Sequence, residues 1–291
     1  MTGPTIGIDM GGTKCLGLLV GADGTVLDRE QQATEVDAVI ETFAGVARAL
    51  AARSAEVVRG VGVGVPGLVD RAGILHAGPH LPGVYSLSVA QRLAEVLAMP
   101  VVADNDATCA TLAEALLGAA RSARSAVVIT VGTGIGAGFV SDGIVLRGAH
   151  GFAGEVGHMC VQPDGPPCIC GRHGCWELYA SGRRASSDVT ARAQLGDPTA
   201  LAILDDISKW LAFGLANLCL AIDPDRIVLG GGVLERAGSQ IVDSTAAHLA
   251  RQFGHAGSTR HRPDIVRAQL GSDAGAIGAA LLARPDRPAG E

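Results

Sequence analysis

The sequence has few aromatic residues and almost no lysine. Only 3% of its 291 residues are aromatic although 48% are hydrophobic, so the cores must be built from Ala, Val, Leu and Ile. Lysine occurs only at Lys14 and Lys209, and arginine supplies the remaining basic side chains. The net charge is −6 and no basic tract is present, which argues against a nucleic-acid partner.

The sequence also lacks export and membrane signals. Its opening residues, MTGPTIGID, have neither the charged nor the apolar region of a signal peptide. No apolar run reaches the roughly 20 residues that a membrane-spanning helix needs. The seven cysteines are an odd number, and four of them fit a metal site better than a disulfide framework. We therefore expect a cytoplasmic protein without a membrane partner.

One segment, residues 155–177, concentrates metal ligands in a loop. It reads EVGHMCVQPDGPPCICGRHGCWE, and its prolines and glycines exclude a helix and favour tight turns. The spacing H-x9-C-x-C-x4-C suits a closed, structural zinc site, with Cys160 as a rival ligand and buried, metal-free thiols as the alternative. Such a site would hold the flanking Glu155 and Glu177 at fixed positions. The predicted Zn²⁺ ligands are His158, Cys168, Cys170 and Cys175.

Glycine, at 41 residues, is unusually frequent, and two similar loops are rich in it. DMGGTKCLGLLVGADGTVL, from Asp9, and TVGTGIGAGFVSDGIVL, from Thr130, both read as strand, glycine loop, strand, Asp-Gly turn and strand. Such a repeat predicts two homologous α/β domains. Glycine loops after strands let backbone N–H groups approach a phosphate, although neither loop is a Walker A or GxGxxG sequence and an ordinary hairpin is the alternative. The candidate phosphate-binding residues are Asp9, Gly11, Gly12, Thr13, Lys14, Gly132, Thr133 and Gly134.

Polar or glycine residues follow other apolar strands as well. Residues 104–106, Asp-Asn-Asp, lie where parallel strands of α/β sheets bind ligands, and a carboxylate there could accept a proton from a substrate hydroxyl. Helix N-capping explains only one of the three. Asp9 suits Mg²⁺, directly or through water, or else a simple turn. Residues 230–232, all glycine, fit a ligand approach and tight strand–helix packing equally well.

Periodicity predicts strands alternating with helices throughout the chain. The expected strands are 5–9, 15–20, 25–27, 60–65, 101–103, 126–131, 137–140, 144–146, 226–229 and 265–268. The expected helices are 35–53, 87–98, 107–120, 180–195, 199–222, 235–253 and 274–283.

Together these motifs resemble the ROK family (repressors, open reading frames and sugar kinases). The resemblance rests on the two glycine loops, the Asn-Asp-Ala after a strand and E-x-G-H-x9-C-x-C-G-x2-G-C-x-E, and it covers essentially the whole chain. It implies an α/β, two-lobed actin-like (ribonuclease H-like) sugar kinase fold with a zinc-bound loop, closing on sugar and ATP. The smaller lobe would comprise residues 1–115, with the helix 274–291 packed on it. The larger lobe would be 116–273, carrying the zinc loop.

The resemblance also implies an ATP- and Mg²⁺-dependent hexose kinase of the glucokinase type, acting as a homodimer or homotetramer. Asp106 would be the base for the 6-hydroxyl of the sugar, and His158 would bind both sugar and zinc. The substrate-binding residues would be Gly67, Asn105, Asp106, Glu155, His158 and Glu177. The nucleotide would be bound by the two glycine loops and by Gly231 and Gly232.

Two departures from the family pattern leave the sugar open. His80-Leu81-Pro82-Gly83-Val84 stands where family glucokinases often have Asn-Leu-Pro-Gly-Trp, and Thr108 stands where Asn often follows Asn-Asp-Ala. The alternative sugars are N-acetylmannosamine, N-acetylglucosamine, mannose and fructose, and polyphosphate is an alternative donor. A sugar-sensing repressor would need an N-terminal winged helix, but the first strand begins by Thr5. A non-catalytic relative would have damage at the base or the phosphate loops, which are intact.

Overall fold

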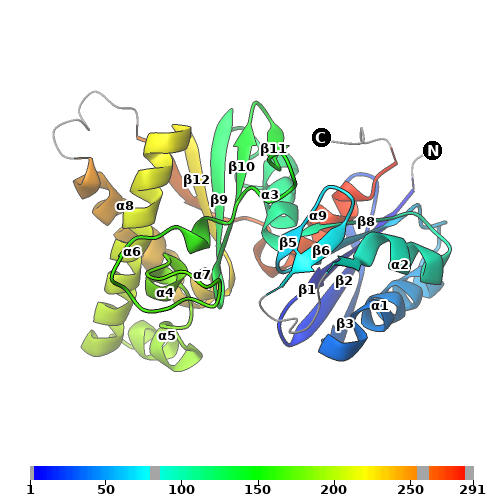
Figure 1. Ribbon diagram of the computed structural model, residues 1–291, viewed down its shortest axis with the longest axis horizontal. Coiled ribbons are helices and arrows are strands. Elements are labelled where there is room, and N and C mark those ends of the chain that lie inside the picture. Colours follow the sequence, from blue (N-terminus) through cyan, green and yellow to red (C-terminus); the bar gives the residue numbers. More distant parts are fainter. Residues whose placement is uncertain (1–2, 79–85, 254–261, 286–291) are drawn as a thin grey trace. The chain divides into compact units, whose positions relative to one another are not determined.

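The structure is a computed structural model, and it describes residues 3–78, 86–253 and 262–285. The chain divides into two compact α/β units, each of which contains a five-stranded sheet (Figure 1). The first unit comprises Met1–Leu117, Ile144–Ala153 and Asp273–Glu291, and the second comprises Gly118–Gly143 and Gly154–Ser272. The sequence predicts one lobe of residues 1–115 with the helix 274–291 packed on it, and a second lobe of residues 116–273. In the structure the first unit also includes the short segment Ile144–Ala153.

The sheet of the first unit has the order β3-β2-β1-β4-β8. Its central strands are buried almost throughout, as expected for a sheet covered on both faces, whereas the edge strand β3 alternates exposed and partly buried residues. The first three strands are antiparallel neighbours, and β4 and β8 run parallel to β1. The strands are β1 (Thr5–Met10), β2 (Lys14–Val20), β3 (Val26–Ala33), β4 (Val61–Val65) and β8 (Val101–Asn105).

Small residues let helices approach this sheet closely. A Cβ atom added to Gly7 or Gly62 would clash with the backbone of α9, so the helix lies directly on β1 and β4. A Cβ atom on Gly278 of α9 would likewise clash with the Cys109 carbonyl of α3. The Ala- and Gly-rich composition of α9 thus allows close packing without aromatic residues. The helices of this unit are α1 (Val39–Arg53), α2 (Val89–Leu97), α3 (Asp106–Leu116) and α9 (Ala274–Leu282).

A small antiparallel sheet, β5-β6-β7, completes the first unit. It consists of β5 (Leu68–Val69), β6 (Ile74–Ala77) and β7 (Leu87–Ser88), strands too short to be predicted from periodicity. Residues 144–153 are linked to this sheet by Arg71, which lies between β5 and β6. Its guanidinium donates hydrogen bonds to the Gly148 carbonyl at 2.7 and 3.2 Å.

The other five-stranded sheet has the order β11-β10-β9-β12-β13, and all of its strands except the edge strand β11 belong to the second unit. It repeats the arrangement of the first sheet, since a glycine-loop hairpin is followed by two strands parallel to the first strand of the hairpin. This agreement in connectivity is what the sequence repeat predicts. The strands are β9 (Ser125–Val131), β10 (Ile135–Ser141), β11 (Ile144–Leu146), β12 (Arg226–Gly230) and β13 (Asp264–Arg267).

Helices of the second unit surround a core of aliphatic residues and one tryptophan. Trp176 is fully buried against Gly214 of α6 and donates a hydrogen bond from Nε1 to the Trp210 carbonyl at 2.7 Å. The α6 helix begins where the Asp197 side chain accepts a hydrogen bond from Ala200 N, a typical N-cap. The helices are α4 (Glu177–Ala180), α5 (Ser187–Gln194), α6 (Pro198–Ile222), α7 (Gly232–Ala237) and α8 (Ser239–Gln252).

The structure divides three of the predicted helices. The helix predicted at 35–53 starts as a 3-10 turn at Val36–Ala38, and the helix predicted at 180–195 becomes α4 and α5. The helix predicted at 235–253 becomes α7 and α8 because Gly238 adopts a φ of +70°, which ends α7. Among the described residues, no helix combines the length and the hydropathy that crossing a bilayer requires.

Candidate functional site

The first glycine loop forms the turn of the β1–β2 hairpin. Gly11 N donates a hydrogen bond to the Lys14 carbonyl at 2.9 Å, and Thr34 Oγ1 donates one to the Gly11 carbonyl at 2.8 Å. Residues 11–14 are exposed, and a Cβ atom on Gly12 would meet nothing within 4 Å. The loop is therefore a tight hairpin, and its tip is open enough for an anion to reach the backbone.

Asp9 and Asp106 lie close together on either side of β4, Asp9 near the carboxyl end of β1 and Asp106 directly after β8. Asp9 is in register with Gly64 of β4, and a Cβ atom on Gly64 would lie 3.6 Å from Asp9 Oδ1 and 3.4 Å from Asp106 Cα. A Cβ atom on Gly275 would lie 2.6 Å from the Asp9 carboxylate. Burial, and next the charge of Asp106, raises the pKa of Asp9 to about 7. The two glycines therefore make room for a carboxylate pair.

Asn105 organises the start of α3. Its Oδ1 accepts a hydrogen bond from Thr108 N at 3.0 Å, and its Nδ2 donates one to the Gly67 carbonyl at 3.1 Å. Asp106 follows as the first residue of the helix, and its Oδ1 accepts a hydrogen bond from Ala107 N at 2.9 Å. The predicted site residues Gly67, Asn105 and Asp106 are therefore joined in one hydrogen-bonded turn.

The sequence gives no signal for the ion pair behind this turn. Asp104 is only 4% exposed, and its Oδ2 lies 2.7 Å from Arg147 Nη2. Its other oxygen, Oδ1, accepts a hydrogen bond from Asn105 N at 2.8 Å. Asp104 was predicted only as part of a polar triplet, and Arg147 lies too far along the chain for spacing to connect the two.

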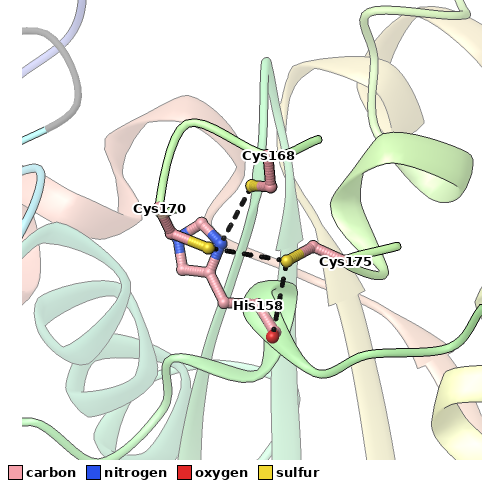
Figure 2. A group of neighbouring side chains, drawn as sticks. All are labelled: His158, Cys168, Cys170 and Cys175. Carbon is pink, nitrogen blue, oxygen red and sulfur yellow. Dashed lines mark hydrogen bonds between the residues drawn. The ribbon is translucent and has the colours of Figure 1, made fainter. Parts of the chain in front are cut away.

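The four predicted zinc ligands of the second unit come together in one cluster (Figure 2). Their ligand atoms all lie within 4.8 Å of one another. Cys168 Sγ is 3.6 Å from His158 Nδ1, and the sulfurs of Cys170 and Cys175 are 3.5 Å apart. Three thiols and one imidazole are the donor set of a tetrahedral Zn²⁺ site, so the residues fit this metal. Cys160, the rival ligand, is exposed and does not belong to the cluster.

Two carboxylates flank His158 on different sides of its ring. Glu155 Oε2 lies 3.9 Å from Nε2, whereas Glu177 Oε1 lies 3.7 Å from Nδ1, the nitrogen that faces the sulfurs. Glu177 is buried, and its Oε1 also accepts a hydrogen bond from Cys168 Sγ at 3.4 Å. A cation bound through Nδ1 would leave Nε2 and Glu155 available for another ligand.

The second glycine loop lies against Glu177. Gly132 N donates a hydrogen bond to the Gly134 carbonyl at 3.0 Å, and Gly182 N donates one to the Gly132 carbonyl at 2.7 Å. A Cβ atom on Gly134 would lie 2.6 Å from Glu177 Oε2. The glycine loop and the metal loop therefore meet at one carboxylate. Gly182 falls within the helix predicted at 180–195, so the sequence does not indicate this contact, whereas in the structure it lies between α4 and α5.

Gly231 and Gly232 lie where β12 turns into α7. Gly231 has a φ of +94°, and a Cβ atom there would lie 2.6 Å from both N and O of Val131. Close packing on the end of β9 therefore accounts for Gly231 without a ligand, which was one of the two explanations left open. The departures at residues 80–84 lie outside the described residues, and Thr108 is buried, with its backbone capped by Asn105.

Comparison with known proteins gives a consistent answer over the whole chain. The model described as ROK family matches residues 5–286. A glucokinase of Streptomyces coelicolor is 31% identical, with 98% of this chain and 99% of that protein covered. An N-acetylmannosamine kinase of Escherichia coli is 33% identical, with 97% and 99% covered.

The fold is similar to that of a solved structure as well. The crystal structure of a ROK family glucokinase from Streptomyces griseus, in complex with glucose and AMPPNP, superposes with a TM-score of 0.88. It is 30% identical in sequence, and the match covers 96% of this chain and 99% of that chain. The α/β fold is therefore shared over nearly the full length.

Proposed function

This chain is a sugar kinase that belongs to the ROK family, and we propose that it acts as a glucokinase, transferring the γ-phosphoryl group of ATP to the 6-hydroxyl of glucose. The predicted family membership is confirmed. The glucose assignment is supported by the glucokinase from Streptomyces coelicolor, and the nucleotide donor by the relative in complex with AMPPNP.

The observation that carries the chemistry is the position of Asp106. Asp106 is the first residue of α3, and a hydrogen bond from Ala107 N orients its carboxylate oxygen Oδ1. Asp9 and Asp106 both lie at strand ends where α/β sheets bind ligands. An oriented carboxylate can accept the proton of a substrate hydroxyl as the oxygen attacks phosphorus, while the phosphoryl group leaves ADP. We assign Asp106 as this general base.

The sugar hydroxyls are bound by groups that the two loops hold in place. Asn105 has a second N–H on Nδ2 beyond the one that it donates to Gly67, and Glu155 and His158 present Oε2 and Nε2 near each other. Glu155, His158 and Glu177 belong to the second unit and supply donors and acceptors that suit hydroxyl groups, as the Asn105 amide of the first unit does. The two glycine loops supply backbone N–H groups for the phosphates, and Lys14 adds charge to the first loop.

Two metal ions belong to this proposal. Zn²⁺ would be held by His158, Cys168, Cys170 and Cys175, and it would supply order to a loop that has little regular structure of its own. Mg²⁺ would accompany ATP and neutralise charge on the phosphates, and the carboxylate of Asp9 is an oxygen donor suited to it, directly or through water. No step of the proton transfer to Asp106 depends on either ion.

N-acetylmannosamine is the second candidate substrate. It is favoured by the identity of 33% to the Escherichia coli kinase, which is as high as the 31% identity to the glucokinase from Streptomyces coelicolor. The two sugars differ at C2, where an acetamido group replaces a hydroxyl, so a site shaped around one should reject the other by a large factor.

An assay of sugar phosphate formation tests the assignment, because this product forms with either donor. Glucose, mannose, fructose, N-acetylglucosamine and N-acetylmannosamine would each be varied with ATP and Mg²⁺, and polyphosphate would replace ATP in a second series. We expect the highest kcat/KM for glucose with ATP. A higher kcat/KM for N-acetylmannosamine would make that sugar, and not glucose, the proposed substrate. In a separate test, a kcat of Asp106→Asn above a tenth of the wild-type value would assign the base to another residue.

A further inference from the structure

An ion pair stands directly behind the proposed catalytic turn. Asp104 precedes Asn105 and Asp106, and its Oδ2 lies 2.7 Å from Arg147 Nη2. The exposed fractions of the two side chains are 5% and 14%, so both charges are largely removed from water. Removing one partner of such a pair leaves a charge buried without compensation, which is far more disruptive than losing a surface ion pair.

Asp104 connects this ion pair to the residues that act on the substrate. Its Oδ1 accepts a hydrogen bond from Asn105 N at 2.8 Å, while Asn105 caps α3 and holds the Gly67 carbonyl. Asp106 follows with Oδ1 bound to Ala107 N. The Asp104 carboxylate therefore contacts the peptide that joins Asp104 to Asn105, one residue before Asp106, and Arg147 contacts the other oxygen of that carboxylate.

The surrounding charges converge on the same place. Asp104 and Asp9 are both in register with Gly64, on either side of it in the sheet. Burial is the largest cause that raises the pKa of the neighbouring Cys109 thiol, and the charges of Asp104 and Asp9 raise it further. The charge of Arg147 has the opposite effect and lowers this pKa. Arg147 is therefore the guanidinium that offsets a group of three nearby carboxylates, the third being Asp106.

We propose that Arg147 is a positioning residue for catalysis, which holds the catalytic turn of Asn105 and Asp106 through its ion pair with Asp104. The inference rests on the proposed function, because it takes Asp106 as the base. Arg147 touches neither sugar nor nucleotide in this proposal. Its loss frees Asp104 to turn away from Asn105 N toward another donor or toward water, and a displacement of about 1 Å in a catalytic group lowers kcat by about 100-fold.

Four variants at the ion pair test the proposal. Arg147→Gln should lower kcat by about 10- to 100-fold and leave KM for ATP within about threefold, whereas Arg147→Lys, which keeps the charge, should recover most of kcat. Asp104→Asn leaves Arg147 without its carboxylate and should be intermediate. In the double variant Asp104→Asn with Arg147→Gln, position 104 is neutral and its amide oxygen can still accept from Asn105 N, so kcat should return to within about fivefold of wild type.

Arg71→Gln is the matched control. Arg71 also holds residues 144–153, but it does so by donating to the Gly148 carbonyl, whereas Arg147 pairs with the Asp104 carboxylate. If Arg147 only fixed this segment, Arg71→Gln would lower kcat as much as Arg147→Gln does. We expect a change below about threefold, and thermal melting of each variant would show that the folded fraction is comparable.

The outcomes separate this inference from the proposed function. A double variant that is folded and as slow as Arg147→Gln would overturn the positioning role, and so would an Arg147→Gln variant with more than half of the wild-type kcat. If Arg147→Gln does not fold, Arg147→Lys and the double variant decide by the same criteria. If Asp106→Asn is active, the base assignment is overturned, and the positioning role with it. If Asp106→Asn is inactive and Arg147→Gln is fully active, only the positioning role is overturned.

Discussion

Glu177 lies against the backbone of Gly134, so closely that a Cβ atom on this glycine would stand 2.6 Å from the Glu177 Oε2 atom. The other oxygen, Oε1, faces Cys168 Sγ at 3.4 Å and His158 Nδ1 at 3.7 Å. One buried carboxylate thus contacts both the glycine loop proposed for phosphate and the cluster proposed for zinc. This contact requires glycine at position 134 for a reason independent of nucleotide binding.

Gly134→Ala should therefore impair sugar binding while the protein stays folded. The new methyl group meets the end of a flexible side chain, so the backbone need not move, but the Glu177 carboxylate must leave its present position. We expect KM for the sugar to rise at least about tenfold, because a displaced carboxylate no longer pairs with the sugar hydroxyls, and the melting temperature to fall by only a few degrees. Calorimetry with the sugar alone measures the effect without the nucleotide.

Gly132→Ala is the control for this prediction, since a Cβ atom there would meet nothing within 4 Å. It alters the same loop without touching Glu177, so sugar affinity measured without nucleotide should match wild type. Equal losses of sugar affinity in both variants would show that the loop as a whole, and not the contact with Glu177, is responsible.

Much of this site could be predicted from the sequence because its residues lie close together along the chain. The spacing of His158 and the three cysteines predicts a cluster, and the structure brings the same four residues together. The two sheets share the strand order that the glycine-loop repeat indicates. Local patterns of this kind record which residues share a turn or a strand.

The contacts that could not be predicted connect distant parts of the chain. Arg147 pairs with Asp104, and Gly275 provides the space for Asp9, yet nothing in either local sequence indicates its partner. The short strands β5 and β6 have too few residues for a period to be visible. Gly238 ends α7 by adopting a positive φ inside a stretch that otherwise reads as one helix, and only the backbone geometry shows this.

Lys14 should assist nucleotide binding without being indispensable. Its side chain is exposed at the start of β2, next to the open glycine turn, and backbone N–H groups already face that turn. Lys14→Ala should raise KM for ATP more than KM for the sugar, because a flexible ammonium adds charge to phosphate groups that other donors also bind. Steady-state kinetics with each substrate varied would give the ranking, and the reverse ranking would place Lys14 near the sugar.

Asp9 should make the protein less stable as the pH rises. Its pKa is about 7 in the folded protein, against an ordinary value of 3.8, because burial and then the charge of Asp106 disfavour the ionised form. Below about pH 4 the group is protonated in both states, and between about pH 4 and pH 7 the folded state retains a proton that the unfolded state has released. The free energy of unfolding therefore falls over this range by about 2–4 kcal/mol from this group, and the loss persists above pH 7.

Asp9→Asn should remove that loss, so urea unfolding at pH 8 should show a more stable variant, with a smaller difference at pH 5. Asp28→Asn is a control of opposite sign, because a hydrogen bond from Arg53 lowers the pKa of Asp28 and its ionised form favours folding. If Asp9→Asn and wild type have equal stability at both pH values, the Asp9 carboxylate is not desolvated in the folded protein.

The zinc ligands should support sugar binding through structure. Cys170 is exposed at the edge of the cluster, with its sulfur 3.5 Å from Cys175 Sγ, so Cys170→Ser removes one ligand with little change in volume. We expect this variant to lose the bound zinc, measured by mass spectrometry, and to lose sugar affinity at least about tenfold. Glu155, His158 and Glu177 all take their positions from the same loop, whose order the metal supplies.

Nucleotide binding should change less than sugar binding in Cys170→Ser, because the first glycine loop belongs to the other unit and Gly134 of the second loop meets the cluster through one carboxylate, that of Glu177. Cys160→Ser is the matched control, since Cys160 is an exposed cysteine of the same loop that does not belong to the cluster, and it should keep both zinc and sugar affinity. A zinc-free Cys170→Ser variant that binds sugar normally would separate the metal from the sugar site. A wild-type protein that purifies without zinc and is fully active would remove zinc from the proposal, because the four ligands would then hold the loop without a metal.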